Sequence, residues 1–386
     1  MIKFQGYARQ DGRVGIRNYI AVIPASVCAA PLVSKLALQH DELMSLAHTS
    51  GCCQLGKDFS RTTEVLTRLA THPNVGAVLW VGLGCEGTPS EEVVETIRQS
   101  GRPVRFIHIQ QAGGSEKAYA RAETQVSELR EELKGSTVTC DADMSNLVVG
   151  LECGGSDATS GLAANPAIGW VTDRVVREGG KVILSETTEL LGAEHVITRN
   201  VRDEAVRSKI IAAVKRVEAR CRESGVDIRG SQPTPGNIEG GLSTIEEKSM
   251  GCVYKAGTTP PSDYLDYGEP VRQAGLSFMD TPGQDVESMT GMAAGGATLF
   301  LFSTGRGSPV GFPIVPTIKI TGNAETYKRM AADIDVDASG IIRGEGIADA
   351  GSRIYETMQG ICRGEKTCSE ETGYHAVSIA SELITL

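Results

Sequence analysis

Four metal-binding side chains stand beside glycine, directly after apolar stretches of the kind that form buried strands. They are one imidazole and three thiols: His48, Cys52, Cys85 and Cys153. Because the carboxyl ends of parallel strands meet at one edge of a sheet, residues that are distant in the sequence can converge there. Thiolate and imidazole suit Fe(II), zinc or an iron–sulfur cluster, and three protein ligands leave a coordination position open. We therefore predict that these four residues form the neighbourhood of a catalytic metal.

The other cysteines lack this context, and cysteine is often buried as a small apolar residue. We expect five of them to be packing or surface residues: Cys28, Cys140, Cys221, Cys362 and Cys368. Cys53 and Cys252 are left undecided. A structural zinc site is the alternative for the predicted ligands, but such sites usually contain closely spaced cysteine pairs, which Cys52, Cys85 and Cys153 do not form.

Two glycine-rich turns after apolar stretches are candidates for binding an anionic substrate. The first offers backbone N–H groups and a hydroxyl, at Gly154, Gly155, Ser156 and Asp157. Such a turn can cradle a carboxylate, although the same residues also suit a simple helix cap. In the second turn, Thr304 precedes Arg306, whose forked donors can bind a carboxylate. A third turn, Gly82–Gly87, fits the dinucleotide pattern but lacks the acidic residue that the next strand should supply, so we do not expect a nucleotide there.

Proton transfer requires a base, and four residues are candidates for it: Lys255, Lys319, Glu186 and Glu189. A lysine serves as a base only if burial or a neighbouring cation lowers its pKa. The two glutamates follow the stretch that ends at Leu184 and are alternatives, as bases or as metal ligands.

The order of elements predicts an α/β protein with two domains, each a mainly parallel sheet covered by helices. Continuous apolar stretches alternate with helical periodicity, and 386 residues exceed the usual size of one core. We place the domains at residues 1–138 and 139–386. We further expect the segment 225–241 to be a loop, and the part after Gly351 to form one helix and a short closing strand.

The composition excludes several classes of partner. The formal net charge is −10 and no cluster of Lys and Arg occurs, so neither nucleic acid nor an anionic membrane surface is an expected partner. The N-terminus lacks the pattern of a signal peptide, and no apolar run approaches the ~20 residues of a membrane span. Ten cysteines without secretion signals indicate reduced thiols. We expect a cytoplasmic protein.

Many motifs in the same order resemble the altronate/galactarate dehydratase family, to which the large subunit of sulfolactate sulfo-lyase also belongs. The matching stretches include Asp11–Asn18, His48–Cys52, His72–Gly76, Gly82–Cys85, Glu152–Asp157, Ser185–Glu186, Pro235–Asn237, Lys255–Gly257, Ser303–Pro309 and Pro316–Lys319. The resemblance implies a lyase that removes a group β to a carboxylate, with a divalent metal, Fe(II) or alternatively Mn(II). It also adds Asn237 to the expected substrate-binding residues.

The resemblance leaves the substrate open. Single-chain sugar-acid dehydratases of the family carry an additional small N-terminal domain, whereas this sequence starts at the Gly6-Tyr7 motif. A separate small partner subunit in a larger oligomer is therefore expected, as in sulfolactate sulfo-lyase. We expect (2R)-3-sulfolactate to yield pyruvate and sulfite, with altronate or a related sugar acid, giving a 2-keto-3-deoxy acid, as the alternative. A non-catalytic subunit stabilised by a metal is the alternative of another class.

Overall fold

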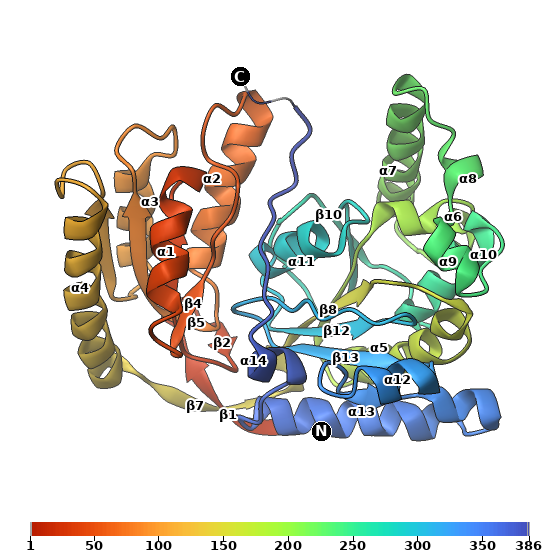
Figure 1. The fold of residues 1–386 in the computed structure, drawn as a ribbon. Coiled ribbons are helices and arrows are strands. Elements are labelled where there is room, and N and C mark those ends of the chain that lie inside the picture. Colours follow the sequence, from red (N-terminus) through yellow and green to blue (C-terminus); the bar gives the residue numbers. More distant parts are fainter. Residues whose placement is uncertain (1, 384, 386) are drawn as a thin grey trace. The chain divides into compact units, whose positions relative to one another are not determined.

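The computed structural model describes residues 2–383 and 385, and the chain divides into two compact units (Figure 1). The N-terminal unit comprises Phe4–Ala142, Phe312–Val315 and His375–Leu386. The C-terminal unit comprises Met1–Lys3, Asp143–Gly311 and Pro316–Tyr374. Both contain parallel sheets covered by helices, so the predicted fold class is confirmed.

The N-terminal unit contains a four-stranded parallel sheet in the order β4-β3-β5-β6. Its strands are β3 (Tyr19–Pro24), β4 (Leu43–Ser45), β5 (Val75–Gly82) and β6 (Val104–His108). All eight residues of β5 are buried, because helices cover both faces of the sheet. A second, three-stranded sheet has the order β2-β1-β7, from β1 (Lys3–Ala8), β2 (Val14–Gly15) and β7 (Thr139–Asp143).

Helices of the N-terminal unit form the two outer layers. Helices α1 (Ala30–Ala37) and α4 (Ser115–Ser136) pack on one face of the four-stranded sheet, and α2 (Gly56–Ala70) and α3 (Ser90–Gln99) pack on the other. The short turn η1 (Val27–Ala29) leads from β3 into α1. Apolar side chains of α1 and α4 meet those of β3 and β5 in one core, which includes Val22, Leu36, Leu79 and Val126.

The C-terminal unit contains a seven-stranded sheet in the order β10-β11-β9-β8-β12-β13-β14, with every pair parallel. The strands are β8 (Val148–Cys153), β9 (Lys181–Leu184), β10 (Asp263–Leu265), β11 (Gly275–Met279), β12 (Leu299–Ser303), β13 (Thr317–Thr321) and β14 (Val336–Asp337). Residues of β12 and β13 are buried throughout, as expected for central parallel strands.

Helices cover both faces of this larger sheet. Those with eight or more residues are α5 (Asn165–Arg177), α7 (Glu204–Glu223), α10 (Ile245–Val253), α11 (Asp285–Ala294) and α13 (Ile347–Cys362). The short ones are α6 (Glu194–Ile197), α8 (Ile228–Ser231), α9 (Pro235–Glu239), α12 (Ala324–Arg329) and α14 (Cys368–Thr372). The described residues of the unit also form the π-helix η3 (Ser160–Ala164) and four 3₁₀ helices, η2 (Met144–Asn146), η4 (Thr187–Leu190), η5 (Tyr254–Ala256) and η6 (Ser339–Arg343).

Each parallel sheet has a point at which the direction of strand addition reverses. In the N-terminal unit the chain adds β4 on one side of β3 and β5 and β6 on the other. In the C-terminal unit the chain adds β9 on one side of β8 and β12 on the other. Loops diverge at such points and leave a crevice beyond the carboxyl ends of the strands, which is the usual ligand site of open α/β sheets.

The predicted domain boundary differs from the observed division. The units separate between Ala142 and Asp143, because β7 pairs with β1 and so stays with the N-terminal unit. Two later segments, Phe312–Val315 and His375–Leu386, also belong to the N-terminal unit. The second of these is held by the buried carboxylate of Asp58, which accepts hydrogen bonds from Ser381 Oγ and from the amides of Glu382 and Leu383. Local sequence pattern does not indicate that a segment near the C-terminus packs with the N-terminal unit.

Two smaller expectations are corrected. The segment 225–241 contains the helices α8 and α9, each capped by an Asp or Thr side chain, and is therefore not a continuous loop. After α13 the chain forms the short helix α14, with no closing strand among the residues that the structure describes.

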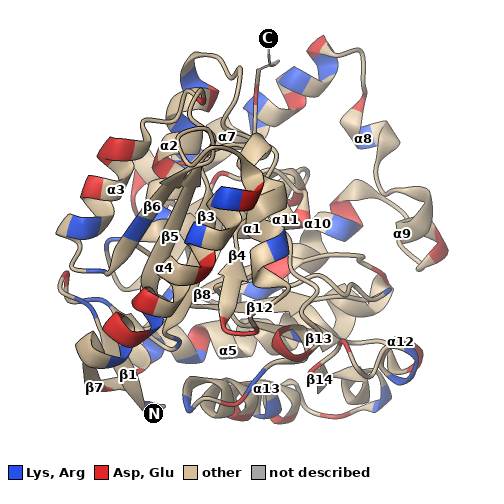
Figure 2. Cartoon of the chain, turned by 60° about the vertical axis from the view of Figure 1, so that its left-hand side comes forward, with Lys and Arg blue, Asp and Glu red and all other residues tan. Residues whose placement is uncertain are grey.

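In the same residues, no helix combines the length and apolar character needed to cross a membrane. Charges of both signs lie along α3, α4 and α13 (Figure 2).

Candidate functional site

Ionisable side chains of the C-terminal unit gather beyond the carboxyl ends of β8 and β9. They come from five elements: Glu152 and Cys153 from the end of β8, Glu186 and Glu189 from the turn after β9, Cys252 from α10, Lys255 from η5 and Asp285 from the start of α11. All except Asp285 are buried. Burial of so many charges is costly unless they are paired with one another or with a ligand.

Lys255 is the cation at the centre of this cluster. Its Nζ lies 2.7 Å from Glu186 Oε2 and 3.3 Å from Glu189 Oε2, and its side chain is 1% exposed. Burial by itself lowers the pKa of Lys255, but the carboxylates of Glu186 and Glu189 outweigh that effect and raise this pKa well above its ordinary value. The base role predicted for Lys255 is therefore not supported, because a base would need a lowered pKa. Lys255 is a fixed positive charge.

The turn that carries Lys255 is seated on α5 by a close approach of two backbones. A Cβ on Gly169 would overlap the carbonyl oxygen of Tyr254, and a Cβ on Gly257 would overlap the carbonyl of Gly169. Thr172 Oγ1 also donates a hydrogen bond of 2.8 Å to the carbonyl oxygen of Lys255. Glycine is required at this crossing because it has no Cβ.

Glu186 is held in an unusual backbone conformation. Its φ of 66° lies in the left-handed region, where a residue with a Cβ is strained by about 1–3 kcal/mol. Its amide donates a hydrogen bond of 2.8 Å to Thr281 Oγ1, and its Oε2 accepts one of 3.0 Å from the amide of Cys153. The conformation directs the carboxylate inward, toward Lys255 and the end of β8. Strained residues of this kind cluster at functional sites.

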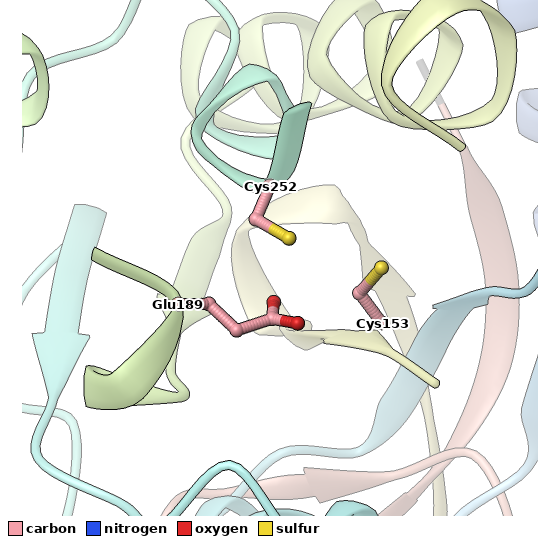
Figure 3. A group of neighbouring side chains, drawn as sticks. All are labelled: Cys153, Glu189 and Cys252. Carbon is pink, nitrogen blue, oxygen red and sulfur yellow. The ribbon is translucent and has the colours of Figure 1, made fainter. Parts of the chain in front are cut away.

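Two thiols and a carboxylate face one space inside the cluster (Figure 3). One ligand atom each of Cys153, Glu189 and Cys252 lies within 4.8 Å of the other two. A hydrogen bond from the Cys252 thiol, assisted by the Lys255 charge, lowers the pKa of Cys153 to about 6, although burial opposes this. Burial raises the pKa of Glu189, but Lys255 and Lys248 lower it more, so this carboxylate is ionised. We refer to these three residues as the sulfur group.

Three carboxyl groups form a second set, which we call the oxygen group. One oxygen each of Glu152, Glu186 and Asp285 lies within 4.8 Å of the others. Burial, then the nearby Asp285, raises the pKa of Glu152 well above its ordinary value, and burial raises that of Asp285 to about 7. Glu152 Oε2 accepts a hydrogen bond of 2.7 Å from Ser288 Oγ. Glu152 Oε1 and Glu186 Oε1 have no partner within the described residues, which leaves room for protons or a cation.

Some residues of the cluster were not assigned from the sequence. Cys252 follows no apolar strand, and its signal is helical: Lys248 lies four residues before it and Lys255 three residues after it, which places them on one face. Glu152 interrupts an otherwise apolar buried strand, which is a signal in itself because charged residues are rarely buried without a role. Asp285 has no comparable local signal, since an acidic residue in the first turn of a helix is common.

A pocket of about 210 Å³ adjoins the sulfur group. Its lining includes Cys252, Ser156, Asn165 and Lys248. Ser156 Oγ lies 3.1 Å from Cys153 Sγ, and Lys248 Nζ lies 3.8 Å from Glu189 Oε1, so the wall of the pocket touches two members of the sulfur group. Its volume suits a small metabolite, and Lys248 supplies a positive charge for an anionic one.

The predicted substrate-binding turns lie together at the reversal point between β8 and β12. Gly154 N donates to Ser303 O at 3.0 Å, and Arg306 N donates to Gly155 O at 2.8 Å. Asn237 joins them, because its Nδ2 donates to Ser156 O at 2.9 Å. These contacts bring the backbone of the two turns together, and only Ser156 and Asp157 among the predicted residues line the pocket.

Several of these side chains already form hydrogen bonds or ion pairs within the protein. The Asp157 carboxylate accepts hydrogen bonds from Thr159, Ser160 and Asn323, so it stabilises the turn. Thr304 Oγ1 accepts a hydrogen bond of 3.0 Å from Gly307 N. The guanidinium of Arg306 pairs with Glu239 at 2.7 Å, and both side chains are exposed. A substrate contact by Arg306 would have to displace this pair.

Lys319 lies elsewhere in the same sheet. On β13 it is the register partner of Phe302, which in turn is the partner of Glu152, so two strand spacings separate its backbone from the cluster. Its Nζ donates a hydrogen bond of 2.6 Å to Pro309 O, and burial lowers its pKa. The structure does not group Lys319 with Lys255 and the glutamates.

The four predicted metal ligands fall into different units. Cys153 belongs to the C-terminal unit, where it meets Glu189 and Cys252, whereas His48, Cys52 and Cys85 belong to the N-terminal unit. Both ring nitrogens of His48 are used within that unit: Nδ1 accepts from Ser50 N at 3.1 Å, and Nε2 contacts Pro24 O at 2.8 Å. Burial lowers the pKa of His48 to about 4, so it is a neutral residue that positions a loop.

The sequence matches the models of two successive domains of one known protein family. Residues 6–134 match "D-galactarate dehydratase/Altronate hydrolase, second domain", and residues 144–385 match "D-galactarate/Altronate dehydratase, C-terminal". The chain is 34% identical to altronate dehydratase of Escherichia coli, over 99% of this chain and 78% of the relative. It is 36% identical to (2R)-sulfolactate sulfo-lyase subunit beta of Chromohalobacter salexigens, over 96% and 95%, and 30% identical to galactarate dehydratase (L-threo-forming) of E. coli, over 96% and 75%.

Replacing Lys255 by Met should destabilise the C-terminal unit by about 3–5 kcal/mol, because Glu186 and Glu189 would be left buried without a cation. The loss should shrink as the pH falls. Glu189 has a lowered pKa in the folded chain, so its stabilising contribution is present above its ordinary pKa of 4.5 and is lost below it. Urea unfolding of the variant at neutral pH and near pH 4 measures both effects.

The matched control is Lys328→Met, which removes an exposed pair with Glu325 and should change stability by less than about 0.5 kcal/mol. A Lys255→Met protein as stable as this control would show that the buried pair does not stabilise the unit.

Proposed function

The chain belongs to the D-galactarate/altronate dehydratase family and is a lyase, and on that premise we propose that it catalyses β-elimination from a small 2-hydroxy acid in the C-terminal unit. The observation that carries this proposal is the buried ion pair of Lys255 with Glu186 and Glu189, beside two thiols and the pocket. Elimination needs a charge sink for the substrate carboxylate and a group that accepts the C2 proton. The cluster contains both kinds of group.

The substrate that we propose is (2R)-3-sulfolactate. Support comes from the 36% identity to a sulfo-lyase subunit over 95% of that relative. A doubly anionic three-carbon acid also suits a pocket of about 210 Å³ with Lys248 in its wall. Altronate is the second candidate, supported by 34% identity to altronate dehydratase over 99% of this chain. By analogy with the relative named subunit beta, we propose that a second, small subunit accompanies the chain in an oligomer in the cytoplasm.

A divalent metal is part of the proposal, and the sulfur group fits one. Cys153, Cys252 and Glu189 would hold it with two sulfurs and one oxygen, a donor set that favours Fe(II) over Mn(II). When bound, the metal would act as a Lewis acid that polarises the substrate carboxylate and hydroxyl and so acidifies the C–H bond between them. Three protein ligands leave coordination positions open for these oxygens.

The side chains of the protein would then move the protons. We assign the C2 proton to the carboxylate of Asp285, because its pKa of about 7 is matched to proton transfer near neutral pH and its side chain is not fully buried. The electron pair of the broken C–H bond forms the C2–C3 double bond, and the electron pair of the C3–S bond leaves with sulfite. The enol that remains tautomerises to pyruvate. A hydroxide leaving group would in addition need a proton donor.

The two substrates are distinguished by their products. Purified chain, together with its small subunit, is incubated anaerobically with Fe(II) and each acid. We expect pyruvate and sulfite in equal amounts from (2R)-3-sulfolactate. Formation of a 2-keto-3-deoxy acid from altronate would instead support the second candidate, and turnover of neither acid would contradict both substrate assignments.

Asp285→Asn should lower kcat by roughly 10²–10⁴-fold with little change in KM, because the variant lacks the proton acceptor but retains the pocket. The control Asp349→Asn changes an exposed carboxylate of α13 and should retain full activity. A kcat for Asp285→Asn within about tenfold of the unmodified enzyme would rule out this assignment of the base.

Cys252→Ser should abolish tight binding of one Fe(II) per chain while the protein remains folded, as measured by metal analysis and circular dichroism. A catalytic site predicts a folded protein without metal, since the cluster retains Lys255 and its partners. Loss of folding in the metal-free unmodified chain as well as in the variant would instead favour a purely structural metal, the non-catalytic alternative.

A further inference from the structure

A second gathering of thiols lies in the N-terminal unit, outside the site described above. Three neighbouring parallel strands, β4, β3 and β5, each lead at their carboxyl ends into a segment with a cysteine. Cys28 lies in η1 after β3, Cys52 and Cys53 follow β4, and Cys85 follows β5. Strand addition reverses between β3 and β5, so this edge is where an open α/β sheet forms its ligand crevice.

Hydrogen bonds join the three segments to one another within four residues of these cysteines. Val27 N donates to Ser50 O at 2.9 Å, which joins the Cys28 segment to the Cys52 segment. Thr88 Oγ1 donates to Ala25 O at 2.9 Å, which joins the Cys85 segment to the Cys28 segment. The contact of His48 Nε2 with Pro24 O makes a third connection. These contacts hold the three cysteine-bearing segments side by side at the sheet edge.

Glycines make the close approach of these segments possible. Gly51, directly before Cys52, has a φ of 91°, and a Cβ there would overlap the carbonyl oxygen of Ala25. Gly84, directly before Cys85, has a φ of 119°. A side chain at either position would be strained, so the glycines are needed for the local shape of the loops that present the thiols.

The thiols are free, and most of them are accessible to solvent. Cys28, Cys53 and Cys85 are exposed, Cys52 is half-buried, and none forms a disulfide. Cys52 Sγ lies 3.7 Å from Cys53 Sγ. Cys53, then burial, then Cys28 and Cys85 raise the pKa of Cys52, so Cys52 lies within electrostatic reach of the other three thiols. Exposed free thiols are avoided on ordinary surfaces because they oxidise, and three of them beside the half-buried Cys52 at one sheet edge point to a bound group that uses them.

We propose that this sheet edge binds an iron–sulfur cluster, with Cys28, Cys52 and Cys85 as its thiolate ligands. A single ion would draw its ligand atoms within a few ångströms, as in the sulfur group. Among the residues that the structure describes, the three thiols do not belong to a set whose ligand atoms all lie within 4.8 Å. No carboxylate joins them either. Sulfur-only donors spread over adjacent loops suit a cluster of several iron atoms better than one Fe(II).

The cluster would be partly open to solvent, because the side chains of Cys28 and Cys85 are exposed. Three thiolates also leave one iron of a four-iron cluster without a protein ligand. This position would be available to a small oxygen-donor ligand. The site is independent of the proposed elimination in the C-terminal unit, since it shares no residue with it.

The test uses the full chain with its small subunit, purified without oxygen and reconstituted with Fe(II) and sulfide. We expect acid-labile sulfide bound in stoichiometric amount with iron and a visible charge-transfer absorption. Each of Cys28→Ser, Cys52→Ser and Cys85→Ser should lose most of the sulfide and the absorption. Cys140→Ser, which removes a half-buried thiol of β7 in the same unit, should keep both.

Two further results separate this proposal from the metal of the C-terminal unit. Cys252→Ser should lose the single Fe(II) but retain the labile sulfide, because its thiol belongs to the other unit. Binding of zinc alone, absence of labile sulfide, or equal sulfide in the three Ser variants and Cys140→Ser would each overturn the iron–sulfur site. None of these results would bear on the elimination chemistry.

Discussion

The C-terminal unit is organised around one buried positive charge. Lys255 is 1% exposed and is held between Glu186 and Glu189. A lone ammonium at this depth would be unstable, and two lone carboxylates equally so, which means that neither side of the pair can be present without the other. Two local features bring these groups within hydrogen-bonding distance. They are the close approach of α5 and η5 at their glycines and the left-handed backbone of Glu186. The thiols and the carboxyl groups take their protonation states from this arrangement.

The side chains around Lys255 divide into ionised groups, which could bind a cation, and carboxyl groups that hold a proton. The pKa of Cys153 is lowered to about 6 and that of Glu189 is also lowered, so these two residues are anionic near neutral pH. The hydrogen bond to Cys153, and then burial, raise the pKa of Cys252 well above its ordinary value. The pKa of Glu152 is raised well above its ordinary value by burial and by Asp285. Anionic groups beside groups that hold protons suit the elimination proposed above, in which a cation would be bound and protons would be moved in the same place.

The candidate sites of the two units lie at the same position in their sheets but differ in how deeply they are buried. In each unit the candidate site residues lie where the direction of strand addition reverses, between β3 and β5 or between β8 and β12. In the C-terminal unit this edge is closed over by α10 and α11, and the groups there are buried and paired. In the N-terminal unit the corresponding thiols are exposed or half-buried, which suits the larger bound group proposed there.

Periodicity and strand-end chemistry in the sequence determined the α/β class and marked Cys153, Glu186, Glu189 and Lys255 as candidate site residues. These features are local, because a buried parallel strand is a continuous apolar run and the residue after it lies at the ligand edge. Tertiary structure alone decided which of them meet. Cys252 and Asp285 approach the end of β8 from helices about 100 residues or more later in the chain, and no pattern in either segment encodes that contact. It also decided the direction in which the pKa of Lys255 moves, because the two neighbouring glutamates that raise it are brought there only by the fold.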